Sequence, residues 1–396
     1  MKIVLLTHAT FFKSKSMPKF AEMLISGYKK DNHDVLVYSP IPFFFKLSRI
    51  FPFLSKWLGY IDQLLLFPIF LRYKISKLAY DDTIFVFCDQ ALGPWVPLLR
   101  NRPHAIHVHD LLALKSSLDL EPINKTNFTG KIYQKYIRKG FEAGSVFISV
   151  SNKTKQDLED FTEVNPKISK VIFNGLNYPY RKLNTTQTAD TIKKKYKLPF
   201  KGYLLNVGSN QWYKNRVGLL HLFRNYIKIT SQPLSLVIVG PPPTKQESIL
   251  INSFNKSREN LLIQFLSDVS NETLNALYSG ARCTLIPSHE EGFGWPIIES
   301  QASGTCVITT NTPPMIEIAG EHSYFLPSTK EFRDGKIELW AEKSVDTLTD
   351  FLHLSTIRRA ELEAKSIEWA NKFSDKKTLS LYLKTYREAL NIYKKP

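Results

Sequence analysis

Cysteine is scarce in this chain of 396 residues, which contains only Cys88, Cys283 and Cys306. Each of the three lies in an apolar, strand-like stretch, and their spacing is not that of a metal site. Disulfides belong mainly to secreted proteins, so we expect three reduced core residues in a cytoplasmic protein. Neither a metal centre nor a disulfide framework is predicted.

The start of the chain is also poor in apolar residues. The opening stretch "MKIVLLTHATFFKSK" has too few of them for a secretory signal peptide. It is typical instead of a first buried strand. This pattern agrees with a cytoplasmic location.

Acidic residues are outnumbered, because 36 Asp and Glu stand against 53 Lys and Arg, a formal net charge of +17. Such a balance favours an acidic partner: a nucleotide, a nucleic acid or an anionic membrane. Zinc-finger spacing, RNA-binding strand motifs and arginine-rich arms are absent from the sequence, so no nucleic-acid partner is predicted. Much of the lysine is scattered, as it would be on a solvated basic face.

Long hydrophobic runs are missing even from residues 41–78, a stretch crowded with Phe, Leu, Trp and Tyr. No run there approaches the ~20 residues that a membrane-spanning helix needs. Aromatic residues mixed with cations, and a single acid at Asp62, fit an interfacial helix on an anionic membrane surface. The alternative is a helix hairpin with basic solvent faces. The cations of this stretch are Lys46, Arg49, Lys56, Arg72, Lys74 and Lys77.

The length of the chain predicts two domains of similar size. Short β-rich runs alternate with amphipathic helices in both halves, which indicates an α/β fold with parallel sheets built from βαβ units. We expect domains at 1–180 and 200–372, a polar linker at 181–199, and a terminal helix at about 376–396. Strands are predicted at 2–7, 34–39, 83–88, 104–108, 146–151, 203–208, 234–240, 260–266 and 283–287, and helices at 20–30, 131–144, 216–229, 245–257, 271–281 and 296–304.

The stretch "HEEGFGWPIIESQASG" places two glutamates, Glu291 and Glu299, around a predicted helix start at Pro296. Glu291 would follow the end of a strand in a flexible loop, where ligands bind in open α/β sheets. Glu299 would lie about one turn into the helix. A helix N-terminus suits a phosphate, and Gly292 and Gly294 would allow a ligand close to the backbone.

Carboxylates accept hydrogen bonds from sugar hydroxyls, but two of them would repel a phosphate. A nearby cation is then required, and Lys214 follows another strand end in "VGSNQWYKN". These residue types together describe a site for a sugar joined to a phosphate. The alternative is a capped helix with solvated acids.

Seven motifs, in order and at the expected intervals, make the chain resemble family 4 glycosyltransferases, which are retaining enzymes of the GT-B fold. The resemblance covers roughly residues 106–320, and it implies two Rossmann-like parallel-sheet domains facing a central cleft. The motifs are "HVHDL" (107–111), "ISVSNKTKQDL" (148–158), "VIFNGLN" (171–177), "NVGSNQWYKN" (206–215), "FLSDVSNETLNALYSGA" (265–281), "PSHEEGFGWPIIESQASGTCVIT" (287–309) and "PPMIEIAG" (313–320).

The resemblance implies a role for each matching residue. Glu299 would hold the ribose hydroxyls of the nucleotide, and Glu291 would contact the donor sugar near its anomeric carbon. Lys214 would neutralise the departing diphosphate. The remaining donor-site residues would be Gly292, Phe293 and Gly294 at the sugar, Trp295 at the diphosphate, and Gly208 with Ser209 in the loop that carries Lys214.

On the N-terminal side, the resemblance places His109 beside the transferred sugar. His107 alternates with it along a strand, so one of the two could simply be buried, and we favour His109 because the "HD" pair ends the strand. Asp110 could orient an acceptor hydroxyl or cap the next segment.

The family's chemistry, carried over, requires no protein nucleophile, because the donor's own phosphate can take the acceptor's proton. No metal and no other cofactor are expected, since the metal-diphosphate clamp Asp-x-Asp is absent from the sequence. The donor would be a UDP- or GDP-sugar and the acceptor a glycan or a lipid-linked glycan.

Two departures from the family pattern matter. The loop after the first strand reads "THATFFKSKSMPKF", where many relatives carry Gly-Gly, so the acceptor cannot be carried over. Ser209 stands where relatives often have arginine, which leaves the diphosphate to Lys214, with Arg216 as a possible substitute.

The function predicted from these patterns is a cytoplasmic, metal-independent glycosyltransferase of bacterial-type polysaccharide, lipopolysaccharide or glycolipid synthesis. It would lie at the inner face of the plasma membrane if residues 41–78 bind lipid. Two alternatives stay open at this point. One is a sugar-nucleotide epimerase of the same fold, and the other is a membrane-binding scaffold without catalysis.

Overall fold

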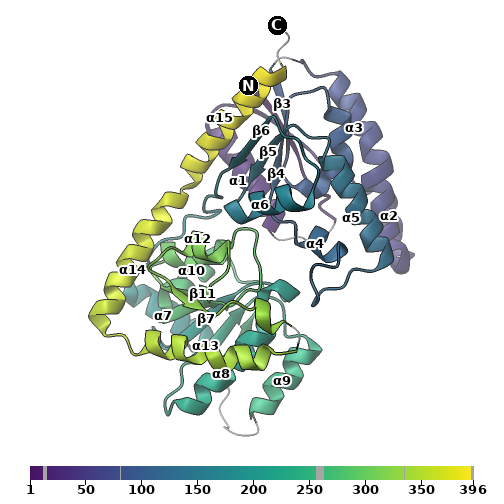
Figure 1. The fold of residues 1–396 in the computed structure, drawn as a ribbon. Coiled ribbons are helices and arrows are strands. Elements are labelled where there is room, and N and C mark those ends of the chain that lie inside the picture. The colour runs from purple at the N-terminus through teal and green to yellow at the C-terminus, as the bar shows by residue number, and fades with distance from the viewer. Residues whose placement is uncertain (12–15, 81, 256–262, 334, 394–396) are drawn as a thin grey trace. The chain divides into compact units, whose positions relative to one another are not determined.

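In the computed structural model, which describes residues 1–11, 16–80, 82–255, 263–333 and 335–393, the chain folds into two units (Figure 1). Each unit contains a six-stranded sheet, and the strand pairs of both sheets are parallel. Unit 1 comprises Met1–Leu120, Lys125–Asn177 and the C-terminal helix, and unit 2 comprises Glu121–Asn124 and Tyr178–Ser374.

The sheet of unit 1 has the strand order β2-β1-β3-β4-β5-β6. Its inner strands are almost continuously apolar and buried, because helices cover both faces of the sheet. The strands are β1 (Lys2–Leu6), β2 (Asp34–Tyr38), β3 (Thr83–Phe87), β4 (His104–Val108), β5 (Val146–Ser149) and β6 (Ile168–Val171).

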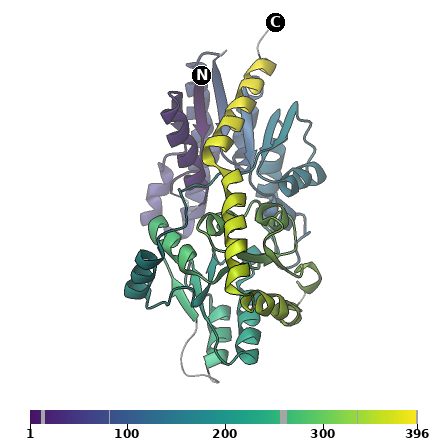
Figure 2. The same cartoon turned by 90° about the vertical axis from the view of Figure 1, so that its left-hand side faces the viewer.

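The helices of unit 1 lie on both sides of this sheet (Figure 1). Helices α2, α3 and α5 cover one face, and α15 covers the other, where it contacts β3, β4 and α1 (Figure 2). The helices are α1 (Ser16–Lys30), α2 (Ser55–Ile61), α3 (Phe67–Ser76), α4 (Leu112–Ser117), α5 (Phe128–Phe141), α6 (Asn152–Phe161) and α15 (Asp375–Tyr393).

The sheet of unit 2 has the order β12-β11-β10-β7-β8-β9. Its core is built from the apolar faces of these strands together with α8 and α13. The elements are α7 (Thr185–Tyr196), β7 (Tyr203–Val207), α8 (Arg216–Ile229), β8 (Ser235–Val239), α9 (Lys245–Asn255), β9 (Ile263–Leu266), α10 (Asn271–Gly280), β10 (Cys283–Ile286), α11 (Trp295–Ala302), β11 (Val307–Thr310), α12 (Met315–Ala319), β12 (Tyr324–Leu326), α13 (Ile337–Leu352) and α14 (Thr356–Ala370).

The structure differs from the sequence expectation in the stretch 181–199. Its polar composition suggests a linker, but it contains helix α7, which belongs to unit 2 and packs on α10. Ile192 alone supplies a fully buried apolar side chain within α7, so the helix carries too narrow an apolar stripe to be recognised from its composition.

Three short strands, β6, β11 and β12, were not expected, since three or four residues give too little alternation to detect. The expected strand at 260–266 is described from Ile263 onward as β9. Residues 256–257 of the expected helix at 245–257 lie outside the described residues, as do residues 394–396 of the terminal helix.

The three cysteines occupy buried positions and are free thiols, as expected. Burial raises the pKa of each thiol, that of Cys306 to about 12. They are therefore unreactive core residues.

Candidate active site

The predicted donor-site residues of unit 2 gather at the carboxyl ends of β10 and β7, which are neighbouring strands. The loop after β10 carries Glu291, and the loop after β7 carries Lys214 in a short 3-10 turn, Trp212–Lys214. Parallel strands end at the same edge of a sheet, so two loops separated by 77 residues in sequence meet there.

An ion pair joins the two loops. The Nζ of Lys214 lies 2.7 Å from Oε1 and 2.9 Å from Oε2 of Glu291, and the Ser288 hydroxyl donates to Oε1 at 2.7 Å. The side chains of Lys214 and Glu291 are only 16% and 6% exposed. A buried pair with this many contacts fixes both side chains in place, so the ammonium group is held at the sheet edge rather than moving freely in solvent.

The loop that carries Glu291 is buried and fixed, contrary to the expectation of a flexible loop. Its backbone oxygens at Pro287 and Ser288 accept hydrogen bonds from Asn215 (2.9 Å) and Thr310 (2.7 Å). The His289 amide donates to the backbone oxygen of Tyr213 at 2.7 Å. Hydroxyl and amide side chains on adjacent loops thus satisfy the backbone that sequence patterns leave open.

The other glutamate of the "HEEG" stretch has a different partner. Glu290 lies 3.3 Å from the guanidinium of Arg333, which also donates to the backbone oxygen of His289 at 3.1 Å. Burial and the charge of Arg333 lower the pKa of His289 to about 3, so the imidazole is neutral. These contacts support the loop, and Glu291 is the carboxylate that meets the lysine.

Helix α11 begins beside Glu291. Gly294 is its N-cap residue, with φ of +95°, a conformation that side-chain-bearing residues rarely adopt. A Cβ built on Gly294 would lie 3.9 Å from Cγ of Glu291. The helix starts at Trp295, one residue before the predicted start at Pro296. Pro296 is therefore the second residue of the first turn, where a proline is still tolerated because its missing N–H has no partner within the helix.

Glu299 lies in the second turn of α11 and is buried. The Tyr278 hydroxyl, from helix α10, donates to its Oε2 at 3.0 Å. Burial and the nearby charge of Glu299 raise the pKa values of Tyr278 and Tyr180, so both phenols keep their protons. The sequence motif identifies Glu299, whereas its tyrosine partners had no signal of their own.

The remaining predicted donor-site residues occupy the same two loops. Phe293 is buried and contacts the rings of Trp295 and Phe373, each at 6.0 Å between centroids, whereas Gly292 and Trp295 are half-buried. Gly208 and Ser209 follow β7 and are half-buried. A Cβ on Gly208 would touch the Lys214 side chain at 3.5 Å, an ordinary contact.

Arg216, named as a possible substitute for a missing arginine, is buried and faces another partner. Its guanidinium donates to the backbone oxygen of Pro241 at 3.1 Å and lies 3.6 Å from the Glu247 carboxylate. The arginine thus ties the start of α8 to the start of α9, and we do not assign it to a diphosphate.

In unit 1, His109 follows β4 and is buried beside Phe20, whose ring centroid lies 4.5 Å away. Its Nε2 lies 2.9 Å from the backbone oxygen of Cys88, and burial lowers its pKa, so the ring is neutral. His107 instead points toward α15, with Nε2 2.7 Å from the Tyr386 hydroxyl. Residues two apart along a strand share a face, and the two rings lie side by side, with centroids 6.4 Å apart and Phe20 against both.

Asp110 is half-buried, and its carboxylate accepts a hydrogen bond from the Leu112 amide at 3.1 Å. This is the capping contact that the sequence left open as one of two roles. The side chain of Gln90 connects this loop to β3, because its amide group bonds the His109 amide and the Asp110 backbone oxygen.

Two further residues at this edge were missed by the sequence analysis. His8 and Asp89 form an ion pair, with His8 Nε2 2.8 Å from Asp89 Oδ2. A usable signal exists, because both lie two residues beyond a buried apolar strand, in "KIVLLTH" and "TIFVFCD". The contact between His8 and Asp89 could not be predicted, however, because it depends on β1 and β3 being neighbours with Leu6 opposite Phe87.

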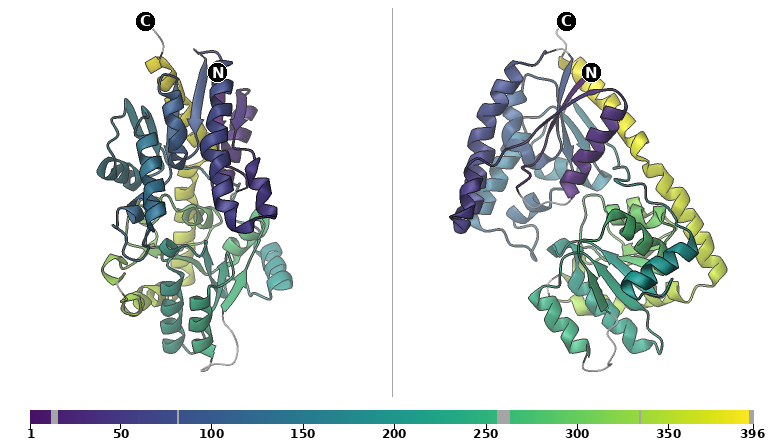
Figure 3. Two further views of the ribbon diagram at one scale, coloured as in Figure 1. Left: turned by 90° about the vertical axis from the view of Figure 1, so that its right-hand side faces the viewer. Right: turned by 180° about the vertical axis from the view of Figure 1, so that it is seen from behind.

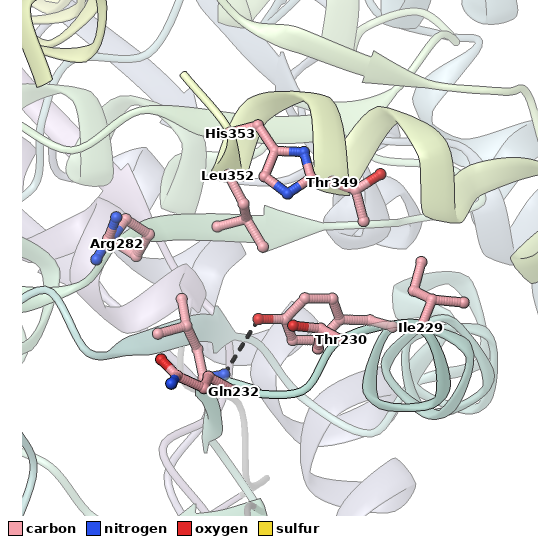
Figure 4. A pocket seen from close by; sticks show the side chains of 9 residues that line it. Ile229, Thr230, Gln232, Arg282, Thr349, Leu352 and His353 are labelled. Carbon is pink, nitrogen blue, oxygen red and sulfur yellow. Dashed lines mark hydrogen bonds between the residues drawn. The ribbon is translucent and has the colours of Figure 1, made fainter. Parts of the chain in front are cut away.

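A cavity of about 340 Å³ lies elsewhere in unit 2 (Figure 4). It is lined by the last turn of α8, by residues that precede β8 and β10, and by the end of α13, and so it lies at the amino ends of these strands. His353 and Arg282 line it, and the Tyr226 hydroxyl accepts a hydrogen bond from the Leu234 amide at 3.1 Å. None of the predicted site residues belongs to it.

Within the described part of the chain, no group of three or more His, Cys, Asp and Glu side chains is arranged to hold a metal ion. Among the helices described, none combines the length and apolar character required to cross a bilayer.

Residues 188–350 match the model of the family described as glycosyl transferases group 1. The O-antigen chain mannosyltransferase RfbU of Salmonella typhimurium is 28% identical over 228 residues, 56% of either chain. The O-antigen chain mannosyltransferase B of Escherichia coli is 28% identical over 163 residues, 38% of this chain and 42% of its own length. The chain thus spans about half the length of the relatives it matches.

Solved structures agree with the fold over the whole chain. Sucrose-phosphate synthase of Thermosynechococcus elongatus superposes with a TM-score of 0.71 at 14% identity, covering 99% of each chain. HepE of Anabaena, solved with UDP and glucose, gives 0.69 at 15% identity, covering 98% of this chain and 100% of its own. The predicted pair of Rossmann-like domains in the GT-B fold is confirmed. The epimerase and scaffold alternatives receive no support from the comparisons.

Proposed function

We propose, on the premise that this chain is a glycosyltransferase of the family 4 type with a group 1 domain over residues 188–350, that it moves a sugar from a nucleotide-diphosphate donor to a hydroxyl of a glycan acceptor. The reaction would serve lipopolysaccharide or polysaccharide synthesis. The observation that carries the proposal is the buried pair of Lys214 and Glu291 beside the start of α11, the helix that holds Glu299.

Each group has a role that its surroundings support. The Glu299 carboxylate, fixed by Tyr278, would accept hydrogen bonds from the ribose hydroxyls. Lys214 would stabilise the negative charge that grows on the departing diphosphate, and Glu291 would keep that ammonium group in place while contacting the donor sugar. The acceptor's proton would pass to the leaving phosphate, with the sugar's configuration retained and neither metal nor cofactor required.

The transferred sugar is proposed to be mannose. Both O-antigen relatives named above are mannosyltransferases, and their similarity to this chain lies at 28% identity. The nucleotide would be of the GDP or UDP type.

Calorimetry tests the donor site directly. We expect GDP-mannose, UDP-glucose or UDP-N-acetylglucosamine to bind the purified protein, and ADP-glucose serves as the comparison. Transfer to octyl glycosides of mannose, glucose, galactose and N-acetylglucosamine is then followed by mass spectrometry, with and without EDTA. Binding of none of the four nucleotides would contradict the proposal, and loss of transfer in EDTA would contradict its metal-independent form.

We also propose that residues 41–78 bind the anionic inner surface of the plasma membrane. Large apolar side chains of this segment stand in solvent, Phe53 at 77% exposure and Trp57 at 54%. The segment forms α2, α3 and short helical turns on the outer side of unit 1 (Figure 3, left). Asp62, its single acid, is buried and accepts hydrogen bonds from the amides of Phe44 and Phe45 at 2.9 and 2.8 Å. The charge left on its surface is therefore cationic.

Binding to lipid vesicles should depend on the exposed apolar side chains of residues 41–78 and on the attraction of the cations in this segment to an anionic lipid. The double variant Phe53→Ser/Trp57→Ser is expected to bind phosphatidylglycerol vesicles at least tenfold more weakly, because burying each side chain contributes about 1.5–3 kcal/mol. Co-sedimentation at low salt measures this effect. Ile357→Ser is the matched control, since Ile357 is equally exposed, at 76%, but lies in α14 of unit 2. Equal binding by all three proteins, or equal binding to phosphatidylcholine, would argue against an anionic membrane partner.

A further inference from the structure

The carboxyl edge of the unit 1 sheet carries a polar cluster in which the donor chemistry gives a role to His109 alone. Strands β1, β3 and β4 are neighbours, and Leu6 pairs with Phe87 in the register of β1 and β3. His8 and Asp89 therefore stand opposite each other, two residues past each strand end. The cluster consists of His8, Asp89, Gln90, His109 and Asp110, which follow three buried apolar strands.

Asp89 is oriented from both sides. Its Oδ2 takes the hydrogen bond of His8 Nε2 at 2.8 Å, and its Oδ1 accepts from the Ala91 amide at 2.9 Å, where it caps the turn Gln90–Leu99. Capping the turn requires only the Asp89 carboxylate, so it does not explain why the His8 imidazole is hydrogen-bonded to that carboxylate. Burying a carboxylate together with an imidazole has a cost in desolvation, so the presence of the pair at the ligand-binding edge of a sheet points to a use.

Within the described residues, only Nε2 of the His8 ring has a hydrogen bond, and Nδ1 is left for a ligand. Nε2 is committed to Asp89, and the side chain keeps 24% of its surface exposed, against 11% for Asp89. A carboxylate that fixes one ring nitrogen sets the tautomer and leaves Nδ1 with its lone pair, the arrangement that accepts a proton or a hydrogen bond from a hydroxyl.

We propose that His8 binds a hydroxyl of the acceptor sugar through Nδ1 and that Asp89 is the positioning residue of this acceptor site. The proposal rests on the proposed function, whose donor groups Lys214, Glu291 and Glu299 belong to unit 2, and it gives unit 1 the contact with the acceptor. A neutral hydroxyl is the fitting ligand, because the carboxylates of Asp89 and Asp110 would repel a phosphate.

The protonation state of His8 makes the site sensitive to pH. Burial lowers its pKa, but the hydrogen bond and charge of Asp89 outweigh this, and the pKa is raised above the usual 6.5. His109, the neighbouring ring, is neutral because burial lowers its pKa. The other titratable groups around the pair are Cys88 on the β3 side, His107 and Asp110 on the β4 side, and Tyr133 on α5.

The lone pair on Nδ1 determines whether acceptor binding is lost at low or at high pH. Protonation converts Nδ1 from an acceptor into a donor, so the hydroxyl bond is lost as the pH falls through the raised pKa of His8. We therefore expect the acidic limb of kcat/KM for the acceptor to lie above pH 6.5. Asp89→Asn removes the charge that raises the pKa of His8, so the acidic limb of the pH profile should move to lower pH.

His8→Gln is the sharpest variant. Its amide can still donate to Asp89, as Nε2 does, but it has no acceptor at the place of Nδ1. With the octyl glycoside and the donor found by calorimetry, we expect the acceptor KM to rise 10–100-fold while the donor Kd stays unchanged. His33→Gln is the control, because His33 precedes β2 at the opposite edge of the same sheet.

The outcomes separate the two proposals. An unchanged acceptor KM in His8→Gln, or an unmoved acidic limb in a folded Asp89→Asn that binds donor normally, would overturn the assignment of the acceptor site and leave the proposed function intact. A loss of donor binding in His8→Gln would also overturn it, by showing a structural role. Failure of the wild type to transfer sugar to any octyl glycoside would instead overturn the proposed function, and this assignment with it.

Discussion

Replacing Glu299 by alanine is expected to weaken donor binding at least ~100-fold while leaving the protein folded. The side chain is buried, and its carboxylate is oriented by the Tyr278 hydroxyl at 3.0 Å. Two hydrogen bonds from ribose hydroxyls to a charged group contribute about 1.5–3 kcal/mol each, and ~1.4 kcal/mol corresponds to tenfold in affinity. Calorimetry with the nucleotide-sugar that binds wild type measures the loss.

Tyr278→Phe is the matched control for this variant. It removes only the hydroxyl that supports Glu299 and keeps the carboxylate, so a loss of about fivefold, near 1 kcal/mol, is expected. Glu299→Gln keeps the shape of the side chain and should fall between the two. Donor affinity in Glu299→Ala equal to that of wild type would remove Glu299 from the donor site.

Loss of the Lys214 ammonium is expected to lower kcat by about 100- to 1,000-fold. The lysine is held at the sheet edge by Glu291, at 2.7 and 2.9 Å, where negative charge would develop on a leaving diphosphate. Removing a preorganised group of this kind costs about 2.7–4 kcal/mol in transition-state stabilisation. Lys214→Met should therefore affect turnover far more than the affinity for donor.

Lys214→Met is also expected to lower the free energy of unfolding, because Glu291 would remain buried without its partner. This loss of stability has to be separated from the loss of turnover. Breaking a buried pair in this way destabilises a protein by about 3–5 kcal/mol. Lys214→Met/Glu291→Gln removes both charges and should restore the unfolding midpoint but not turnover.

Lys201→Met gives the comparison for a similar pair, since Lys201 lies 3.1 Å from Glu363 at the amino end of β7. It should lower stability without a matching fall in kcat. If Lys201→Met and Lys214→Met reduced kcat equally, the role of Lys214 would be structural.

Local patterns determined much of the donor site. The helix start at "GWPIIES" follows from proline in the first turn and from a glycine that takes a positive φ, and both properties belong to the residues themselves. Periodicity likewise placed Glu299 on that helix and Lys214 after a strand. The alternation of short buried strands with helices predicted the α/β fold, because it leaves few architectures other than open parallel sheets, and the motif order implied the GT-B arrangement through the family resemblance.

The partners of these residues were decided by tertiary structure. Lys214 meets Glu291 because β7 and β10 are neighbours, although 77 residues separate the two side chains. His8 meets Asp89 for the same reason, across β1 and β3, at a separation of 81 residues. A sequence shows where each strand ends, but the order of strands in a sheet arises only when both faces are packed.

The same limit explains the corrections. The stretch 181–199 has a linker's composition, and only its packing on α10 makes helix α7 recognisable. The loop of Glu291 has the glycines of a mobile segment, yet Tyr213 and Asn215, in the loop after β7, and Thr310, at the end of β11, bind its backbone. Residue type and periodicity are local properties that the sequence determined by itself, whereas hydrogen-bond partners and burial depend on contacts between distant segments, which only the folded chain brings together.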